Sequence, residues 1–264
     1  MSKSLSLSPF DVPSPGLARV NRLVKSQSGQ DRLLMTYQYA AYVAIAILNS
    51  KRFGNKARRD LAGRIEKLRA VISDARILYR LFGLFPILSW AQSLNDPETQ
   101  PQDKQLFLLE KLQAWSMLLY YPLEHTYYLA SKGVFSLKPS RINSIAIWSC
   151  RFWAAYVVLQ IFHIRRSFQI VNRSRSTLAR SARERVQSGE VTTAEAVQEE
   201  KQQLTALREK EKELKRDCWV QAGYLPLTAH WSLPHGLLPS NTWVGVCGTV
   251  AAVAGLEGVW KSTA

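Results

Sequence analysis

Cysteine and histidine are scarce in this chain of 264 residues, and their scarcity excludes several kinds of site. The three cysteines, Cys150, Cys218 and Cys247, are odd in number and widely spaced, which argues against a secreted disulfide framework and a metal site. The four histidines lack partners at metal-ligand spacing, and no glycine-rich loop could cradle a phosphate. Glu110 and Glu124 share one apolar segment, but no third group completes a site with them. We therefore expect no enzyme, no catalytic residue, no metal and no cofactor.

Acidic residues are outnumbered by 35 Lys and Arg to 20 Asp and Glu, which gives a formal net charge of +15. The excess is concentrated in residues 1–90, which carry a net charge of +10, whereas residues 91–144 are neutral. Such a basic region needs an anionic partner, either nucleic acid or an acidic membrane surface. The chain has no zinc-finger spacing, RNA-recognition aromatic motif or basic zipper. We therefore expect an anionic phospholipid membrane as partner and no nucleic acid.

Shifts in composition divide the chain into regions. Residues 1–16 are rich in Ser and Pro, so we expect a disordered lead-in. They hold no apolar core of signal-peptide length. Residues 17–90 form a basic amphipathic helical region, and residues 91–104 form a linker. Residues 105–264 form a membrane-associated helical region, with a charged helical insert at about 173–217. The expected fold is all-α: a helical membrane protein with amphipathic N-terminal helices, apolar helices and a charged solvated helix.

The stretch from residue 58 to residue 82 predicts an amphipathic helix, because its apolar residues recur at steps of four and three. Arginines flank this stripe, and such long cationic side chains suit a helix that lies in a membrane interface. Packing onto the protein's own core is the alternative, and Ile77 and Leu81 on the polar side favour it. The candidate membrane-binding residues are Arg58, Leu61, Arg64, Ile65, Leu68, Arg69, Ile72, Arg76, Tyr79, Arg80 and Phe82.

Residues 145–164 are the best candidate for a membrane span, because they hold one full charge, Arg151, in twenty residues. About 20 apolar residues cross a hydrocarbon core of roughly 30 Å. We expect Arg151 to meet an acidic or carbonyl partner inside the protein or at an interface. A buried helix of a soluble bundle is the alternative. Residues 106–134 read as a buried or membrane-associated helix kinked near Pro122, so the number of spans stays open.

Residues 243–259 are apolar and crowded with glycine and alanine. Glycine costs about 1 kcal/mol against alanine in a soluble helix, but in a membrane small residues let two helix backbones approach closely. The segment therefore predicts a helix-packing surface in lipid. The candidate helix-packing residues of the chain are Arg151, Gly245, Gly248 and Gly255.

Four short motifs follow one another along the chain: Gly29, Asp31, Arg32, Leu33, Leu34, Gln38 and Tyr39; Ala75, Arg76, Arg80 and Leu81; Trp148, Ser149, Cys150, Arg151, Phe152 and Trp153; and Gly245, Gly248, Thr249 and Gly255. In this order they resemble the motifs of the peroxin-eleven family (peroxisomal biogenesis factor 11), in a fungal-type member. They span about residues 20–260, and the insert at 173–216 is long for the family. The resemblance implies a peroxisomal membrane protein that elongates peroxisomes before fission, self-associates as a homo-oligomer, and works with a fission adaptor and a dynamin-type GTPase.

A mechanism follows from the residues themselves. A basic amphipathic helix inserted into one leaflet adds area to that leaflet, and the asymmetry bends the bilayer. Two other functions stay open. In a membrane pore or metabolite channel, Arg151, Glu124 and Glu257 would line a polar path between helices. In a soluble helical scaffold, the apolar helices would pack only against each other.

Overall fold

The structure is a computed structural model that describes residues 14–50, 55–188 and 193–263. All regular elements of these residues are helices, which confirms the expected all-α fold. The predicted lead-in at 1–16 lies outside the described residues up to position 13, and its last residues start the first helix. The elements are α1 (Pro15–Lys25), α2 (Gln27–Leu48), α3 (Lys56–Tyr79), η1 (Arg80–Gly83), α4 (Leu84–Ser93), α5 (Lys104–Ser131), α6 (Pro139–Ser188), α7 (Ala194–Ser232) and α8 (Asn241–Lys261).

Short polar side chains set where the helices begin. The Ser26 hydroxyl accepts the backbone N–H of Gly29 at the start of α2, and the Asn55 side chain accepts that of Arg58 at the start of α3. Asp103 accepts two backbone N–H groups in the first turn of α5. Such caps satisfy N–H groups that have no partner inside the helix, so these three helices start where the sequence offers a cap.

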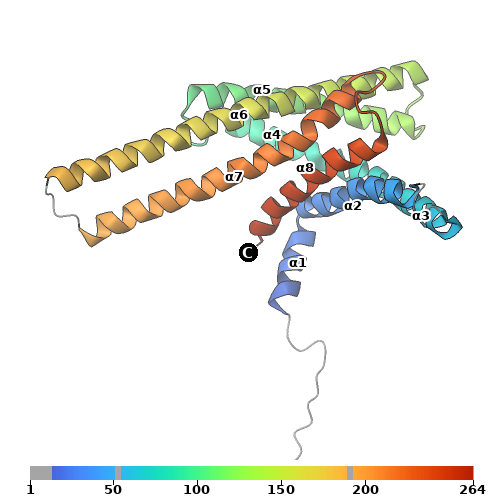
Figure 1. Cartoon of the computed structure of the whole chain (residues 1–264). Helices are drawn as coiled ribbons and strands as arrows, with labels where there is room; N and C mark the ends of the chain where they lie inside the picture. The colour runs from blue at the N-terminus through green and yellow to red at the C-terminus, as the bar shows by residue number, and fades with distance from the viewer. Residues whose placement is uncertain (1–13, 51–54, 189–192, 264) are drawn as a thin grey trace, which may run out of the picture.

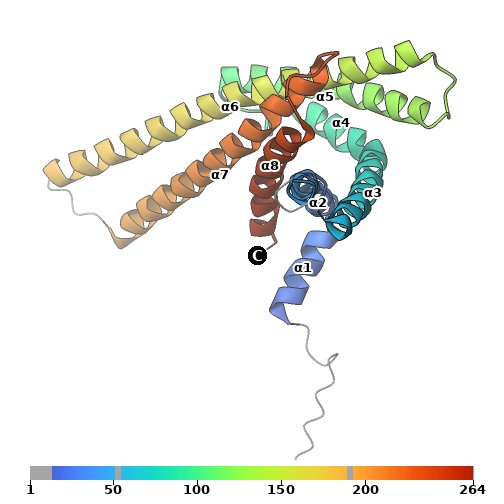
Figure 2. The same cartoon turned by 45° about the vertical axis from the view of Figure 1, so that its right-hand side comes forward.

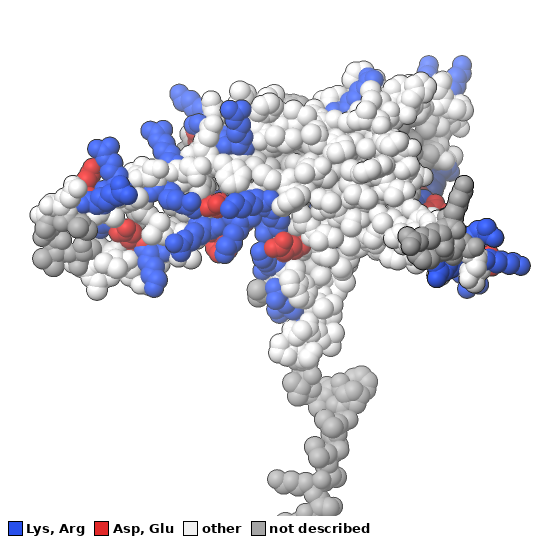
Figure 3. Space-filling view, in the orientation of Figure 1, with Lys and Arg blue, Asp and Glu red and all other residues white. Residues whose placement is uncertain are grey.

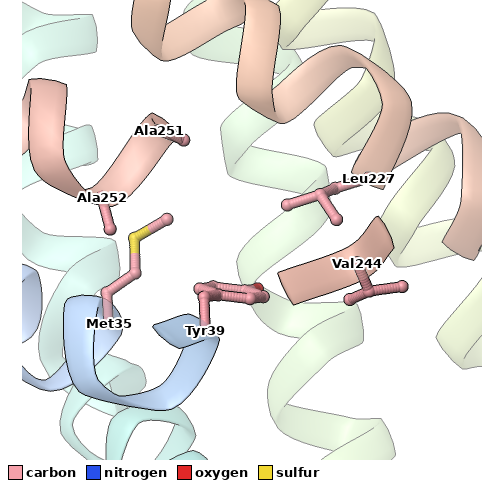
Figure 4. Close-up of a cluster of buried hydrophobic side chains, with 6 residues drawn as sticks. All are labelled: Met35, Tyr39, Leu227, Val244, Ala251 and Ala252. Atoms are coloured by element: carbon pink, nitrogen blue, oxygen red, sulfur yellow. The ribbon is translucent and has the colours of Figure 1, made fainter. Parts of the chain in front are cut away.

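The central core lies where α2 packs against α8 and the second half of α7 (Figure 4). Met35 and Tyr39 of α2 meet Leu227 of α7 and the small residues Ala251 and Ala252 of α8. Each of these side chains is at most 5% exposed. Small residues on α8 let the backbones approach, so a thin core holds three helices together.

Helices α5 and α6 lie side by side, and the first half of α7 returns along the second half of α6 (Figures 1 and 2). Ile164 and Val171 of α6 and Leu214 of α7 form a second buried cluster between them. α6 has 50 residues, which at 1.5 Å per residue is roughly 75 Å. The apolar segment 145–164 is therefore the first part of a helix that passes Arg165 and Arg166 without a break.

The α6–α7 arm, defined here as residues 165–188 of α6 with 194–215 of α7, contains most of the predicted charged insert. It projects from the rest of the molecule (Figure 1). Lys and Arg side chains gather along it, whereas the central part of the same face carries few charges (Figure 3). Ion pairs such as Arg185 with Glu200 join the two helices of the arm. Leu207 and Leu214 of the predicted insert pack against α6.

Two helices, α6 and α8, are long and apolar enough to cross a membrane. Only 11% of the apolar window in α6 and 28% of that in α8 is buried by the rest of the chain. A core helix of a soluble protein is mostly buried, so exposure of this extent fits an apolar surrounding.

Candidate functional site

A buried arginine holds α3 against α2. The guanidinium of Arg76 donates to Asp31, with 2.8 Å between Nε and Oδ1, and to the side-chain oxygen of Gln38 at 2.6 Å. Gln38 in turn donates to the Ser73 hydroxyl. Burial raises the pKa of Asp31, but the charge and hydrogen bonds of Arg76 outweigh it and leave this pKa below its ordinary value. The motif in α2 and the motif in α3 thus meet in one ion pair.

A second ion pair holds η1 against α5. Arg80 donates to both carboxylate oxygens of Glu124, with 2.6 Å between Nη2 and Oε1. The Tyr120 hydroxyl donates to the same Oε1. The ring nitrogen Nε2 of His125 lies 3.0 Å from the carbonyl oxygen of Arg80. Both carboxylate oxygens of Glu124 therefore accept hydrogen bonds, from Arg80 and from Tyr120 of the same helix. The buried carboxylate thus has hydrogen-bond partners inside the bundle.

These two ion pairs stand in the wall of a cavity of about 740 Å³ between α2, α3, α5, α6 and α7. Aromatic rings make up much of the remaining wall. Trp153 and Trp231 stack with ring centroids 5.8 Å apart, and Trp153 meets Tyr224 edge-on at 5.4 Å. Arg32 donates to the Tyr224 hydroxyl at 2.6 Å. The wall of the cavity thus combines two ion pairs, several aromatic rings and one further arginine, Arg32.

The outward side of α3 and the turns that follow it is apolar. Its exposed side chains include Val71 and Leu78, which the sequence pattern did not single out, while the predicted Ile65 and Ile72 are half-buried. The actual stripe is therefore rotated about the helix axis from the predicted one. We call it the α3–α4 stripe, and its members are Leu61, Leu68, Val71, Leu78, Tyr79, Phe82, Phe85 and Leu88.

The five arginines predicted to flank the stripe have different surroundings. Arg58 and Arg64 are exposed near the start of α3. Arg69 pairs with Glu66, and its guanidinium lies over the ring of Tyr42 on α2. Arg76 and Arg80 point into the protein, where they form the ion pairs described above, because carboxylates on α2 and α5 meet them there. As a correction, we remove Arg76 and Arg80 from the candidate membrane-binding surface.

The glycines of α8 lie against α2 and its neighbours. An added Cβ at Gly248 would sit 2.1 Å from Cδ1 of Tyr39, and one at Gly245 would sit 2.6 Å from Cβ of Tyr42. At Gly255 it would sit 2.9 Å from the guanidinium carbon of Arg32. Side chains at Gly245 and Gly248 would therefore push α8 away from α2, whereas at Gly255 the flexible end of the Arg32 side chain would have to move.

Arg151, which we expected inside the protein or at an interface with an acidic or carbonyl partner, lies at the surface of α6. Its side chain is exposed, donates to the carbonyl oxygen of Ser232 and lies over the ring of Trp148. Of the three residues considered for a polar path, only Glu124 lines the cavity. Arg151 lies elsewhere, and Glu257 is exposed and pairs with Lys261. Glu124, Arg151 and Glu257 therefore do not converge on one channel. In the described part of the chain, no three His, Cys, Asp or Glu side chains could hold a metal ion.

The fold and these surfaces define a class: an all-helical protein with two potential membrane spans, a packed polar interior and an exposed apolar helix face. The sequence model of the family described as Peroxisomal biogenesis factor 11 (PEX11) matches residues 17–260, and the chain belongs to that family. Its role therefore lies in peroxisome biogenesis, in a family of peroxisomal biogenesis factors rather than a class of enzymes. No curated protein and no solved structure gives a significant match.

Proposed function

We propose that this protein resides in the peroxisomal membrane and elongates it by inserting the α3–α4 stripe into the anionic leaflet. The observation that carries the proposal is the exposure of the stripe: Val71 is 65% exposed, Phe82 69% and Phe85 65%. Soluble monomers rarely expose a row of large apolar side chains such as this one, which runs along α3 and on through η1 and α4, without a partner surface. A lipid surface fits, because Arg58 and Arg64 are exposed at the same helix.

The energies are sufficient for stable interfacial binding. Full burial of one Val, Leu or Phe side chain is worth roughly 1.5–3 kcal/mol, and the stripe holds eight large side chains that are about half exposed. Each surface Lys or Arg adds about 1 kcal/mol on an anionic leaflet. Insertion of this face into one leaflet expands that leaflet alone, and the area difference curves the bilayer.

The rest of the bundle supports an anchored position at the membrane. Helix α5 exposes a row at steps of four, three and four: Leu108, Leu112, Trp115 and Leu119. Its two glutamates turn the other way, where Glu110 meets His163 and Glu124 meets Arg80. Charges paired on the inside and apolar side chains on the outside are what a helix beside lipid requires. We therefore place α5 with α6 and α8 in the membrane-embedded part.

Self-association and the recruitment of a fission adaptor and a dynamin-type GTPase are the part of the proposal that rests on the family resemblance. The α6–α7 arm is the surface that best suits such partners, since it projects from the bundle and carries many charges (Figure 3). Charged surfaces of this kind set the rate and specificity of association more than its strength.

The test is flotation of the purified protein with anionic vesicles, comparing Val71→Glu with Ala70→Glu. The two positions are adjacent on α3 and both exposed, but only Val71 belongs to the stripe. To separate the stripe from the apolar spans, tubulation of vesicles that already contain the protein is measured in the same preparations. We expect Val71→Glu to abolish tubulation and Ala70→Glu to leave it intact. Equal tubulation by the two variants would show that the stripe does not bend membranes.

A further inference from the structure

The cavity between α2, α3, α5, α6 and α7 has an unbalanced charge. Three arginines and two carboxylates line it. Arg76 is matched by Asp31 and Arg80 by Glu124, through the ion pairs already described. Arg32 forms no ion pair with any carboxylate of the described residues; its bonds go to the Tyr224 hydroxyl and the Met35 sulfur. One positive charge therefore remains unmatched beside a space of about 740 Å³.

The hydrogen-bonding groups of the wall also favour an anion, because several donors in the wall lack an acceptor. The oxygens of Asp31 and Glu124 are already used by arginine and tyrosine donors. The lining donors that have no acceptor within residues 14–50, 55–188 and 193–263 include the hydroxyl of Tyr39 and the indole N–H groups of Trp153 and Trp231. A buried or half-buried donor without a partner raises the free energy of the folded protein. A wall with unpaired donors therefore favours a ligand that carries hydrogen-bond acceptors.

The position of His230 adds one more donor. Its Nδ1 accepts the backbone N–H groups of Leu237 and Leu238, at 2.8 and 3.0 Å. A neutral ring that accepts at Nδ1 carries its proton on Nε2, which is then a donor. His230 lines the same cavity, on the side formed by the end of α7.

The remaining wall suits an apolar body. Tyr39, Trp153, Tyr224 and Trp231 form a chain of ring contacts with centroid distances between 5.4 and 6.5 Å. Pockets for small organic ligands usually have volumes of about 300–1,000 Å³ and apolar walls with a few placed polar groups. Apolar chain atoms can lie against these aromatic faces while an oxyanion reaches the donors.

We propose that this cavity binds an anionic amphiphile with one phosphate or carboxylate head group and a single apolar chain. Arg32 supplies the charge for the head group, with Tyr39 and His230 as neutral donors, and the aromatic wall holds the chain. Binding neutralises the unmatched arginine and fills a space in the centre of five helices. The site does not depend on the membrane-bending role of the α3–α4 stripe, because that stripe faces the other way.

The test is native mass spectrometry of the full-length protein released from nonionic micelles, with probes that differ in one feature. Dodecyl phosphate and dodecanoate carry both head group and chain; dodecanol lacks the charge, and inorganic phosphate lacks the chain. We expect one bound molecule of each charged amphiphile, with about tenfold weaker binding of dodecanol and of inorganic phosphate. Inorganic phosphate that binds as tightly as dodecyl phosphate would assign the site to a soluble oxyanion and overturn the proposal, as would dodecanol that binds equally.

Two variants locate the site. Arg32→Gln keeps a donor for Tyr224 but removes the charge, and we expect about tenfold weaker binding of dodecyl phosphate. Tyr39→Phe removes a hydroxyl without a partner in the described residues, so the fold is kept even if Arg32→Gln unfolds, and binding should weaken about threefold. Arg64→Gln, on the exposed start of α3, is the matched control and should bind as the parent does. Parent-like binding by Tyr39→Phe, or an equal loss in Arg64→Gln, would contradict the proposed site.

Discussion

Arg76 and Asp31 lie 45 residues apart in the sequence and form a direct ion pair, with 2.8 Å between Nε and Oδ1. Arg76 is only 7% exposed. The residue that an amphipathic pattern places at a lipid surface is thus the one that holds α3 to α2. Because this contact fixes how α3 is rotated, it also decides which apolar side chains of α3 face outward.

Removal of one partner of this pair should destabilise the bundle. Asp31→Asn leaves Arg76 buried without a full counter-charge, and we expect a loss of about 3 kcal/mol in the free energy of unfolding. Asp74→Asn is the control, because Asp74 pairs with Lys132 where both side chains are about half exposed, and it should cost less than about 1 kcal/mol. Equilibrium unfolding of the protein in nonionic micelles measures both. Similar costs for the two variants would rule out a special role for Asp31.

Close packing of α8 on α2 should make one glycine indispensable. In Gly248→Ala the new methyl group would overlap the ring of Tyr39, and we expect a loss of about 2 kcal/mol or more. Gly63→Ala in α3 is the matched control, since nothing lies within 4 Å of its added Cβ. There alanine should stabilise the helix by about 1 kcal/mol. The same unfolding measurement decides, and a Gly248→Ala protein as stable as the parent would disprove the packing argument.

The α6–α7 arm should loosen in acid. Hydrogen bonds from Lys215 and then Arg175 lower the pKa of Glu211 from its ordinary 4.5 to about 2. A carboxylate with a lowered pKa stabilises the folded state above the unfolded-state pKa and loses that contribution as the pH falls toward the folded-state value. Amide hydrogen exchange in the arm, corrected for its intrinsic pH dependence, should therefore accelerate between about pH 4.5 and pH 2. Glu211→Gln should remove most of this change, whereas Glu184→Gln, an exposed carboxylate on the same arm, should retain it.

Tubulation of anionic vesicles should depend on the position of a charge relative to the α3–α4 stripe and not only on the net charge. Arg64→Glu and Arg59→Glu change the net charge equally, but on a helical wheel Arg64 lies on the same side as the stripe and Arg59 lies on the opposite side. We expect Arg64→Glu to weaken tubulation of anionic vesicles more strongly, and the difference to shrink at high salt, because screening acts over about 10 Å at 0.1 M. If the two variants behaved alike at every salt concentration, only overall charge would be acting.

In cells, the stripe and the apolar spans should be separable. A protein with both Val71→Glu and Leu78→Glu keeps α6 and α8 intact, so we expect it still to reach the peroxisomal membrane. The organelles should stay round because the leaflet is not expanded. Light microscopy of labelled peroxisomes measures both location and shape, with Ala70→Glu as control. Elongation by the double variant would show that the stripe has no part in shaping the organelle.

The sequence by itself determined the helical class, the two apolar helices and the family. Periodicity, caps and the length of apolar runs are local properties, and residues close in the chain carry them. The glycines of α8 were visible for the same reason, because several glycines within one short apolar segment indicate a close approach of helix backbones. Local patterns show that residues 58–82 have an apolar face and charged flanks, but they do not show which flank meets another helix.

Only the tertiary structure decided that question. Asp31 and Glu124 are far from Arg76 and Arg80 in the chain, so no helical wheel of α3 could assign those arginines to the interior. Their ion pairs turn Val71 and Leu78 outward and bring Ile65 and Ile72 toward the bundle. The cavity with its unmatched Arg32 arises in the same way, since five helices contribute its wall. Burial and charge pairing are properties of the assembled helices, and they fix the site that periodicity leaves open.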